Sequence, residues 1–457
     1  MRRQIGIAGA TTTLVGLVVG ISIFILPGTL AATAGPAVIA SYALASFLTL
    51  FVCVVAAQIG SLFPVSGATF VAIGRLVSPF FGFVTVWMMI GAISVAIALV
   101  AYGTADYLQQ ILPGTNRPLA AWGIVLTLAA LNVVGMKANV TAQTLMVAVF
   151  AVALAVFIAA GAMNVRADYL VPFAPNGWWP VAAAAIPAFF SFAGFMIIID
   201  IGGEIRDPAR TIPRALGLSF LIVLLTYALV SLAVVGTIPW QQLAGIAAPV
   251  GEAAARILPS SVAVGIAAAA VAAGATSING LLLAYSRDVL ALARAGIFPE
   301  ALAKVSPRRG TPVNGVLFLT ALALIGLSLE SGVTALATII TIALLILQVF
   351  LGVAVLTAPR KLSALYAAAP FRLGRAALWF FGGGLILFSL AFLAVAVSDS
   401  PRSVLFAACH LLVGCAYYVT RRRYLLGRGI DVDQRIRDEA EGISETTSAA
   451  TAVPPLH

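Results

Sequence analysis

The sequence predicts an all-α integral membrane protein with about twelve transmembrane helices. Of the 457 residues, 62% are hydrophobic and 9% are charged, whereas a soluble domain carries roughly a quarter charged residues. Many stretches without Asp, Glu, Lys or Arg are as long as the roughly 20 apolar residues that cross a bilayer. The basic residues lie mostly in short loops that would face one side of such a membrane.

The uncharged stretches place the helices in order along the chain. Residues 4–74 hold two helices, and ten later uncharged stretches hold one each. The expected helices cover residues 6–31, 36–62, 79–112, 118–134, 139–163, 181–204, 213–237, 261–294, 313–329, 333–358, 375–397 and 402–421. Residues 239–258, between the seventh and the eighth helix, are too polar to span a membrane, and we expect them to cap its outer face.

The loop charges predict the orientation. With both termini in the cytoplasm, all basic residues face the cytoplasm except Arg117, Arg166, Arg256 and Arg402. This distribution obeys the positive-inside rule and indicates a multi-pass protein of the inner (plasma) membrane with cytoplasmic N- and C-termini.

The two ends of the chain differ in composition. The N-terminus runs into a Gly-rich apolar helix without a signal-peptide cleavage site, so we expect that helix to be the first span. Residues 1–424 are expected to form a single transmembrane domain. Residues 425–457 become polar and rich in Ser, Thr, Ala and Pro, which predicts a disordered cytoplasmic tail.

The scarcity of reactive groups excludes several function classes. An enzyme would need clusters of His, Asp, Glu or Cys within the spans, and the only histidines are His410 and the terminal His457. The three cysteines lack C-x-x-C spacing, so no metal site, disulfide framework or haem site is expected. No channel filter motif is present, and the net charge of +10 lies in loops without interleaved aromatics, which argues against nucleic-acid binding.

Glycines interrupt the first and the sixth helix, which open two successive sets of five. The two segments read Gly20-Ile21-Ser22-Ile23-Phe24 and Phe189-Phe190-Ser191-Phe192-Ala193-Gly194-Phe195. Interrupted helices at matching positions of two halves indicate a midplane binding site in an inverted-repeat transporter. Close helix packing would explain one glycine alone, but the pair favours a site.

A break in a membrane helix supplies backbone groups that suit a zwitterion. The N-terminus of a half-helix carries partial positive charge for a carboxylate, and unwound carbonyls can accept hydrogen bonds from an ammonium. Such groups are tolerated at membrane depth only where they face a cavity. The predicted substrate site comprises Gly20, Ile21, Ser22, Ile23, Phe190, Ser191, Phe192, Ala193 and Gly194.

Three further motifs, taken with these breaks, carry a family resemblance. They are Gly203-Glu204-Ile205-Arg206-Asp207-Pro208-Ala209-Arg210-Thr211-Ile212-Pro213-Arg214; Ser286-Arg287 with Ala293-Arg294-Ala295-Gly296-Ile297-Phe298-Pro299 and Thr311-Pro312-Val313-Asn314; and Asn132-Val133-Val134-Gly135-Met136-Lys137 with Gln143. From about residue 5 to residue 420 the chain resembles the amino acid-polyamine-organocation superfamily. The resemblance implies the LeuT-type fold, in which two inverted five-helix repeats are followed by two extra helices and the first and sixth helices unwind mid-membrane.

The resemblance also implies a function, secondary active transport of amino acids by alternating access. Relatives carry at the position of Phe190 an aromatic gate that closes over the substrate; ordinary helix packing is the alternative for this residue. Met196 stands where several relatives, including antiporters of basic amino acids, carry an acid. We therefore expect small to medium neutral L-amino acids, with a polyamine or cationic amino acid transporter or exchanger as the alternative.

The coupling ion is left open between sodium, a proton and uncoupled exchange. The segment Ala273-Gly274-Ala275-Thr276-Ser277 resembles the one through which sodium-coupled members offer two hydroxyls. With Ala273 and carbonyls of Gly20 and Ile23, Thr276 and Ser277 would hold Na⁺; alternatively, both hydroxyls bond back to carbonyls one turn earlier.

Two other positions are relevant to proton coupling. Proton-coupled relatives often carry a lysine where this chain has Phe150. Asp200 is an ionisable residue inside the membrane and so a functional candidate. It shares a helix face with Glu204, one turn later, and either could carry a proton. Asp200 could also attract a cation, or lie in a wet vestibule beside an arginine. No cofactor is expected, the partners are the amino acid and the lipid bilayer, and the protein is expected to be a monomer or homodimer.

Overall fold

The structure is a computed structural model that describes residues 5–63, 67–134, 136–200, 202, 205–306, 311–328, 332–431 and 434–435, with the backbone alone described for 134 and 136–144. The expected tail beyond residue 435 and the motif residues Gly203 and Glu204 lie outside the described residues. Among the described residues the regular secondary structure is helical, apart from an isolated bridge between Ile5 and Ile205. The α-helices are α1 (Ile7–Val19), α2 (Ser22–Ala34), α3 (Val38–Leu62), α4 (Ala68–Leu76), α5 (Pro79–Ile111), α6 (Arg117–Val134), α7 (Met136–Asn164), α8 (Trp178–Phe190), α9 (Ile197–Asp200), α10 (Pro208–Thr237), α11 (Pro249–Ile257), α12 (Ser260–Arg294), α13 (Val313–Leu327), α14 (Val333–Lys361), α15 (Ser363–Ala368), α16 (Arg375–Asp399) and α17 (Pro401–Leu426).

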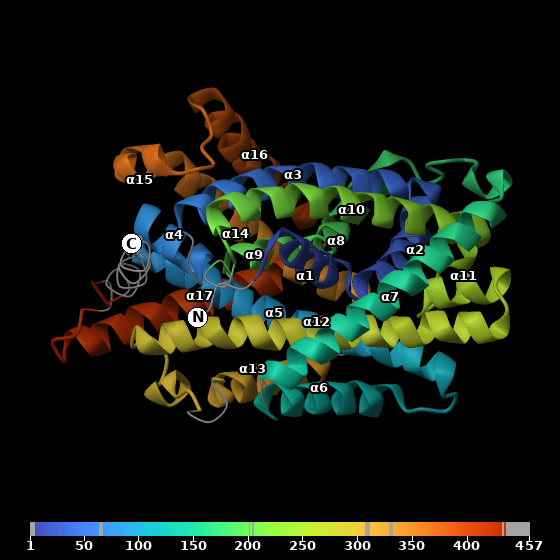
Figure 1. Ribbon diagram of the computed structural model, residues 1–457, viewed down its shortest axis with the longest axis horizontal. Coiled ribbons are helices and arrows are strands. Elements are labelled where there is room, and N and C mark those ends of the chain that lie inside the picture. Colours follow the sequence, from blue (N-terminus) through green and yellow to red (C-terminus); the bar gives the residue numbers. More distant parts are fainter. Residues whose placement is uncertain are drawn as a thin grey trace, which may run out of the picture.

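Short 3₁₀ turns join several of these helices. They are η1 (Gly35–Ala37), η2 (Ala167–Leu170), η3 (Ala193–Met196), η5 (Trp240–Gln242) and η6 (Glu300–Ala303). The long helices run side by side along the longest axis of the molecule (Figure 1).

The described helices account for the expected membrane segments. Eight are long and apolar enough to cross a bilayer, one of them running through α2, η1 and α3, and the bent pair of α8 with η3–α9 makes a ninth. The shorter apolar helices are α1, α6 and α13. Because α1 and α2 are the two halves of the first segment and α3 is the second, the described residues contain the twelve segments that the sequence predicts.

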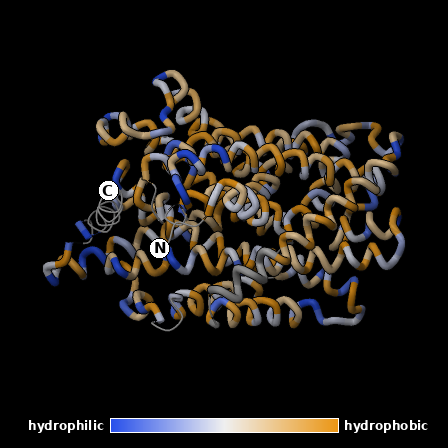
Figure 2. The backbone as a smooth tube through the Cα atoms, viewed as in Figure 1, coloured by the Kyte–Doolittle hydropathy of each residue, from blue (hydrophilic) through white to orange (hydrophobic). Residues whose placement is uncertain are grey.

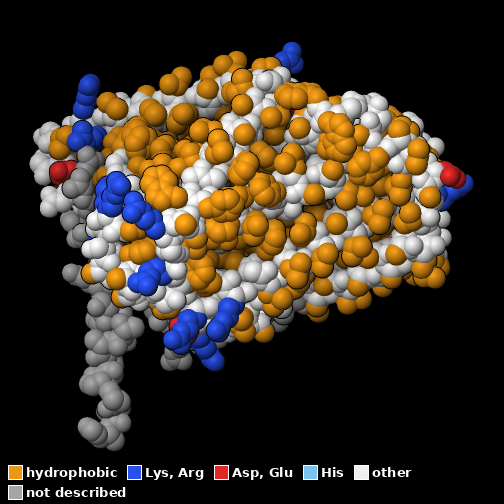
Figure 3. Space-filling view, turned by 90° about the horizontal axis from the view of Figure 1, so that it is seen from above, with side chains coloured by type: hydrophobic (Ala, Val, Ile, Leu, Met, Phe, Trp, Pro, Cys, Tyr) orange, Lys and Arg blue, Asp and Glu red, His pale blue; other side chains and the backbone are white. Residues whose placement is uncertain are grey.

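The surface of the bundle is that of a membrane protein. A broad hydrophobic band covers its middle, and Lys and Arg side chains gather mainly at one end (Figures 2 and 3). Large apolar side chains are exposed on the outer helices, among them Leu145 on α7, Leu387 on α16 and Leu412 on α17. In water such a band would be unstable, so it is the surface that lipid tails cover.

The two broken segments lie at the centre of the bundle. Helix α1 packs against α10 and η3, and α2 packs against α8. Around them stand α3, α5, α10, α12 and α14, with α12 packed along α5 and α3 along α10. This arrangement encloses both breaks inside the helical wall.

Three details differ from the helices expected from the sequence. Helix α10 begins at Pro208, so Pro213 lies inside it and does not start it. Proline is tolerated at the first position of a helix, which Pro208 occupies, because the N–H groups of the first turn have no partner within the helix. At Pro213, the sixth residue of α10, the missing N–H removes one hydrogen bond within the helix. The sequence analysis did not predict α4, because nine residues are too few to span a membrane. It predicted only a cap for residues 239–258, whereas these residues contain η5 and α11, and α11 packs on α2 and α12.

Candidate functional site

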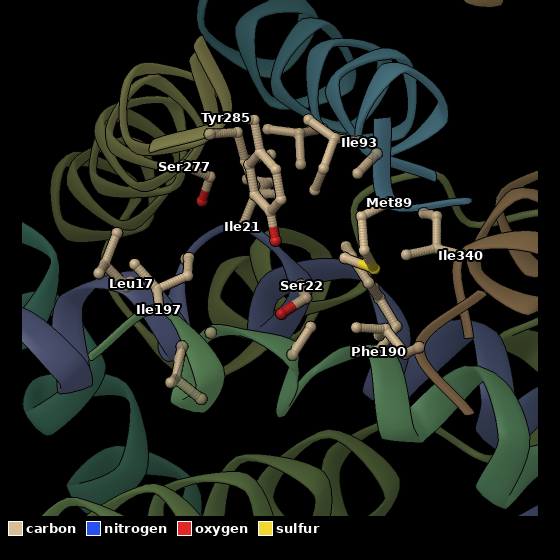
Figure 4. Close-up of a pocket in the computed structure, with 18 residues that line it drawn as sticks. Leu17, Ile21, Ser22, Met89, Ile93, Phe190, Ile197, Ser277, Tyr285 and Ile340 are labelled. Carbon is tan, nitrogen blue, oxygen red and sulfur yellow. The ribbon is translucent and has the colours of Figure 1, made fainter. Parts of the chain in front are cut away.

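A cavity lies where the two broken segments face α5, α12 and α14. It holds about 60 Å³ of space accessible to the centre of a water molecule, and a single water needs roughly 10–15 Å³. Its size therefore suits several waters or a small solute. Figure 4 shows the side chains around it, which are Leu17, Val18, Gly20, Ile21, Ser22, Met89, Ile93, Ala96, Val100, Phe190, Ala193, Gly194, Ile197, Ser277, Leu281, Tyr285, Ile340 and Leu344.

The first break occurs at Gly20 and Ile21, between α1 and α2. Gly20 has φ 37° and ψ −154°, a conformation that glycine adopts far more readily than any other residue. A Cβ at this position would lie 2.3 Å from the Ser277 hydroxyl oxygen on α12. The break therefore needs glycine both for its backbone and for its contact with α12.

Tyr227 on α10 stabilises this break from behind. Its hydroxyl oxygen lies 2.6 Å from the Ser22 hydroxyl and 3.4 and 3.3 Å from the carbonyl oxygens of Val18 and Val19. The last carbonyls of a helix lack partners within it. Tyr227 thus satisfies groups that the break releases, and its ring stacks on Tyr42 with centroids 5.0 Å apart.

The second break separates α8 from η3, and the two halves are bent by 41°. Two backbone bonds turn the chain, from Ser191 N–H to the Ala188 oxygen and from Phe192 N–H to the Phe189 oxygen, both 3.0 Å. A Cβ on Gly194 would lie 3.0–3.1 Å from atoms of Val18 and Leu17. Gly194 therefore lets the second break approach the end of α1.

The helix ends at the cavity have opposite polarity. The N-terminus of α2 and the C-terminus of α8 both reach the cavity, at Ser22 and Phe190. An α-helix carries partial positive charge at its N-terminus and partial negative charge at its C-terminus. The two breaks thus offer separate places for an anionic and a cationic group.

The opposite wall is apolar. Met89, Ile93, Ala96 and Val100 of α5 recur every three or four residues and so share one helix face. With Ile340 and Leu344 of α14 they form a hydrocarbon surface across from the breaks (Figure 4). No Asp, Glu, Lys, Arg or His is among the described residues that line the cavity.

The hydroxyls of the predicted sodium site donate to a carbonyl one turn earlier. Thr276 Oγ1 lies 2.7 Å and Ser277 Oγ 3.0 Å from the Ala273 carbonyl oxygen. This is the back-bonding geometry common for Ser and Thr in helices. Ser277 also reaches the cavity beside Gly20, whereas Thr276 and Ala273 are fully buried behind it.

Asp200 ends α9, and its carboxylate makes two described hydrogen bonds, both to Thr69. One carboxylate oxygen accepts from the Thr69 N–H at 3.0 Å and the other from its hydroxyl at 3.2 Å. An arginine partner, one of the alternatives for Asp200, is not among the described hydrogen-bond partners of its carboxylate, which both belong to Thr69. Asp288 of α12, which the sequence analysis passed over, lies near enough to interact electrostatically with Asp200.

The profile of the family described as amino acid permease matches residues 5–415. The chain belongs to the amino acid permease family. It is thus a multi-pass membrane transporter of amino acids and not an enzyme, and the expected LeuT-type fold and superfamily are confirmed.

Named relatives of the chain are transporters, and two of them are amino acid permeases. The chain is 29% identical to the branched-chain amino acid permease BcaP of Bacillus subtilis, over 79% of this chain and 82% of the relative. It is 30% identical to BcaP of Lactococcus lactis, over 68% and 72%. It is also 28% identical to the methylthioribose transporter of Bacillus subtilis, over 73% and 78%.

In this permease the cavity gathers most, but not all, of the predicted site. The predicted residues that line it are Gly20, Ile21, Ser22, Phe190, Ala193, Gly194 and Ser277. The predicted residues that do not line it are Ile23, Ser191, Phe192, Ala273, Thr276 and Asp200. Ile23, Ser191 and Phe192 are buried beside the breaks, where they support the backbone.

The sequence analysis missed the wall that faces the breaks. The α5 residues lie in a segment hydrophobic on all sides, so only their spacing of three and four residues hints at a shared face. Tyr285 on α12 was also missed, and its hydroxyl points into the cavity (Figure 4). It lies eight residues, about two helical turns, after Ser277.

Proposed function

We propose that this permease carries neutral amino acids of small to medium size with aliphatic side chains, by alternating access. The observation that carries the proposal is the two-sided cavity, with helix ends of opposite polarity on one side and hydrocarbon on the other. A free zwitterion matches the first side and an uncharged side chain the second. The names of the two BcaP relatives support a branched aliphatic side chain such as that of leucine.

The proposed orientation of the substrate follows from the helix ends. Its carboxylate lies near Gly20, Ile21 and Ser22, at the positive end of α2. Its ammonium lies near the Phe190 and Ser191 carbonyls, at the negative end of α8. The Phe190 ring then serves as the gate over the bound amino acid.

The alternative substrates fit the cavity less well. A polyamine or a cationic amino acid brings a second positive charge, which is costly to bury without a partner. The described residues that line the cavity include no acid. Asp106, at the end of α5, is paired with Arg117 through two contacts, and the Nη2 atom of Arg117 lies 2.9 Å from the Oδ2 atom of Asp106. A neutral side chain avoids this cost.

For coupling we propose sodium first and a proton second. The Ser277 oxygen lies beside the Gly20 backbone, and the Ala273 carbonyl and the Thr276 hydroxyl lie close by. Together with carbonyls of Gly20 and Ile23 they offer the oxygen ligands that a hard cation prefers. Proton transfer through Asp200 and uncoupled exchange are the competing mechanisms.

We also propose that the protein lies in the inner membrane with both termini in the cytoplasm, as a monomer or homodimer. The basic end of the bundle, which includes Arg421, Arg422 and Arg423 of α17, then faces the cytoplasm. Residues 1–424 form the transporter in this proposal, and residues 425–457 a cytoplasmic tail.

The test is uptake of radiolabelled leucine into proteoliposomes. Uptake should saturate, show counterflow and be inhibited by valine, isoleucine and alanine. N-acetyl-leucine and leucine amide, which each lack one end of the zwitterion, should not compete. Strong competition by putrescine or arginine without competition by neutral amino acids would replace this proposal with the cationic alternative.

A further inference from the structure

Asp200 caps a helix that is distant in sequence. The loop helix α4 has Gly67 as its N-cap, and glycine has no side chain to bind the free N–H groups of the first turn. Asp200 supplies the capping groups that Gly67 lacks. Its carboxylate accepts hydrogen bonds from the Thr69 N–H and hydroxyl, and its carbonyl oxygen accepts one from the Gly67 N–H at 3.1 Å. Three hydrogen bonds thus join α9 to the start of α4.

These bonds connect opposite walls of the cavity. Helix α4 packs along α5 and α14, which carry Met89 and Ile340 of the apolar wall. Helix α9 continues the second break, and its Ile197 lines the cavity one turn before Asp200. A displacement of α9 away from α5 and α14 must therefore break the contact between Asp200 and Thr69.

The contact consists of only three hydrogen bonds, so a transport cycle can break it. A hydrogen bond to a charged group contributes more than a neutral one, but only by a modest net amount. Asp288 of α12 also lies near enough to Asp200 to interact with it electrostatically, and the two carboxylates repel each other when both are ionised. The Thr69 donors offset this repulsion while the contact lasts.

We propose that the contact between Asp200 and residues 67–69 is a latch that keeps the cavity shut at the α9 end. When the latch opens, α9 and Ile197 move off the apolar wall, and the cavity becomes accessible past Tyr285 and Leu281. The inference rests on the proposed transport function, because it concerns the same cavity. It assigns to Asp200 a positioning role that does not require the carboxyl to carry a proton.

Cysteine labelling tests the latch without any substrate. In a variant that lacks the three native cysteines, Leu281→Cys reports on the α9 end of the cavity, and Val100→Cys, farther along α5, serves as the matched control. The rate of reaction with a polar methanethiosulfonate reagent is measured in purified protein. We expect Asp200→Ala to raise the rate at Leu281→Cys about tenfold, which corresponds to 1.4 kcal/mol, and to leave Val100→Cys unchanged or slower.

Substitutions of Thr69 separate the latch from other roles of Asp200. Thr69→Val removes one donor but keeps the carboxylate, and should raise labelling at Leu281→Cys severalfold. Thr69→Ser keeps the hydroxyl and should label like the parent. If neither Asp200→Ala nor Thr69→Val changes the rate, or if both reporters speed up equally as the melting temperature falls, the latch is wrong. Because no substrate is present, this outcome is distinct from a failure of the leucine uptake test.

Discussion

The two helix breaks reach the same cavity but are held open differently. The first depends on backbone conformation, because Gly20 has a positive φ and lies against Ser277. At the second break, residues 190–196 are all described, and none of them has a positive φ. This break turns through ordinary 3₁₀ geometry, and Gly194 serves only to let α1 approach.

The two breaks also differ in the side chains that support them. Behind the first break, the Tyr227 hydroxyl binds Ser22 and approaches the carbonyls that α1 releases. The second break is supported mainly by apolar packing, with Phe192 against Tyr42 and Tyr227. We therefore expect the first break, which polar contacts support, to hold one end of a zwitterion, and the second break to be the one that moves with α9.

The largest expected effect follows from Gly20→Ala. One added Cβ would clash with the Ser277 oxygen and force an unfavourable backbone conformation, so we expect loss of leucine uptake by at least about a hundredfold. Gly20→Leu should abolish binding altogether. Uptake is measured in proteoliposomes, with membrane insertion checked on the same preparation. Normal uptake by Gly20→Ala would refute the strict conformational requirement at the first break.

At the second break the same substitution should be mild. The nearest atoms to a Cβ on Gly194 lie at 3.0–3.1 Å and can be relieved by a shift of a few tenths of an ångström. We expect Gly194→Ala to retain uptake within about fivefold, because only a slight repacking is needed, and Gly194→Leu to abolish it. A folded Gly194→Leu protein with unchanged affinity would remove this break from the site, and equal losses for the two alanine variants would erase the contrast between the breaks.

Loss of the Tyr227 hydroxyl should have a smaller effect. Tyr227→Phe keeps the ring that stacks on Tyr42 but removes the bonds to Ser22 and the α1 carbonyls. A buried hydrogen bond contributes about 0.5–1.5 kcal/mol net, so we expect a lower melting temperature and an approximately fivefold higher KM for leucine. Ser22→Ala breaks the same bond, and the double variant should lose less than the two single losses combined. Additive losses would show that Tyr227 does not act through Ser22.

Much of this fold could be predicted from the sequence because the bilayer imposes simple rules. Spans are long and uncharged, so Asp, Glu, Lys and Arg alone delimit the eleven stretches that hold the twelve expected helices. The breaks were predicted because glycine and serine interrupt apolar runs at matching places, and the structure ends α1 at Val19 and α8 at Phe190.

The rest could not be predicted because it depends on which faces meet. Met89 and Ile340 lie in segments that are apolar on every side, and periodicity cannot show which face points inward. Tyr227 and Thr69 act through partners 205 and 131 residues away, and no local pattern reports such distances. The start of α10 was misplaced because Pro213 was taken for the first residue of a helix that has a second proline, Pro208, at its true start.

The smallest expected effect concerns Ser277, which faces the first break and has no counterpart at the second. If sodium binds at Gly20, Ser277→Ala removes one oxygen ligand, and the sodium concentration for half-maximal uptake should rise several-fold while KM for leucine at saturating sodium changes little. Thr276→Ala should add to this shift. Uptake is measured with sodium replaced by choline at constant pH, and Ser277→Thr, which keeps the hydroxyl, is the control.

Full uptake in choline would exclude sodium coupling, and a sodium dependence that survives in the double alanine variant would place the ion elsewhere. Uptake driven by an inward pH gradient and lost in Asp200→Asn would then favour the proton.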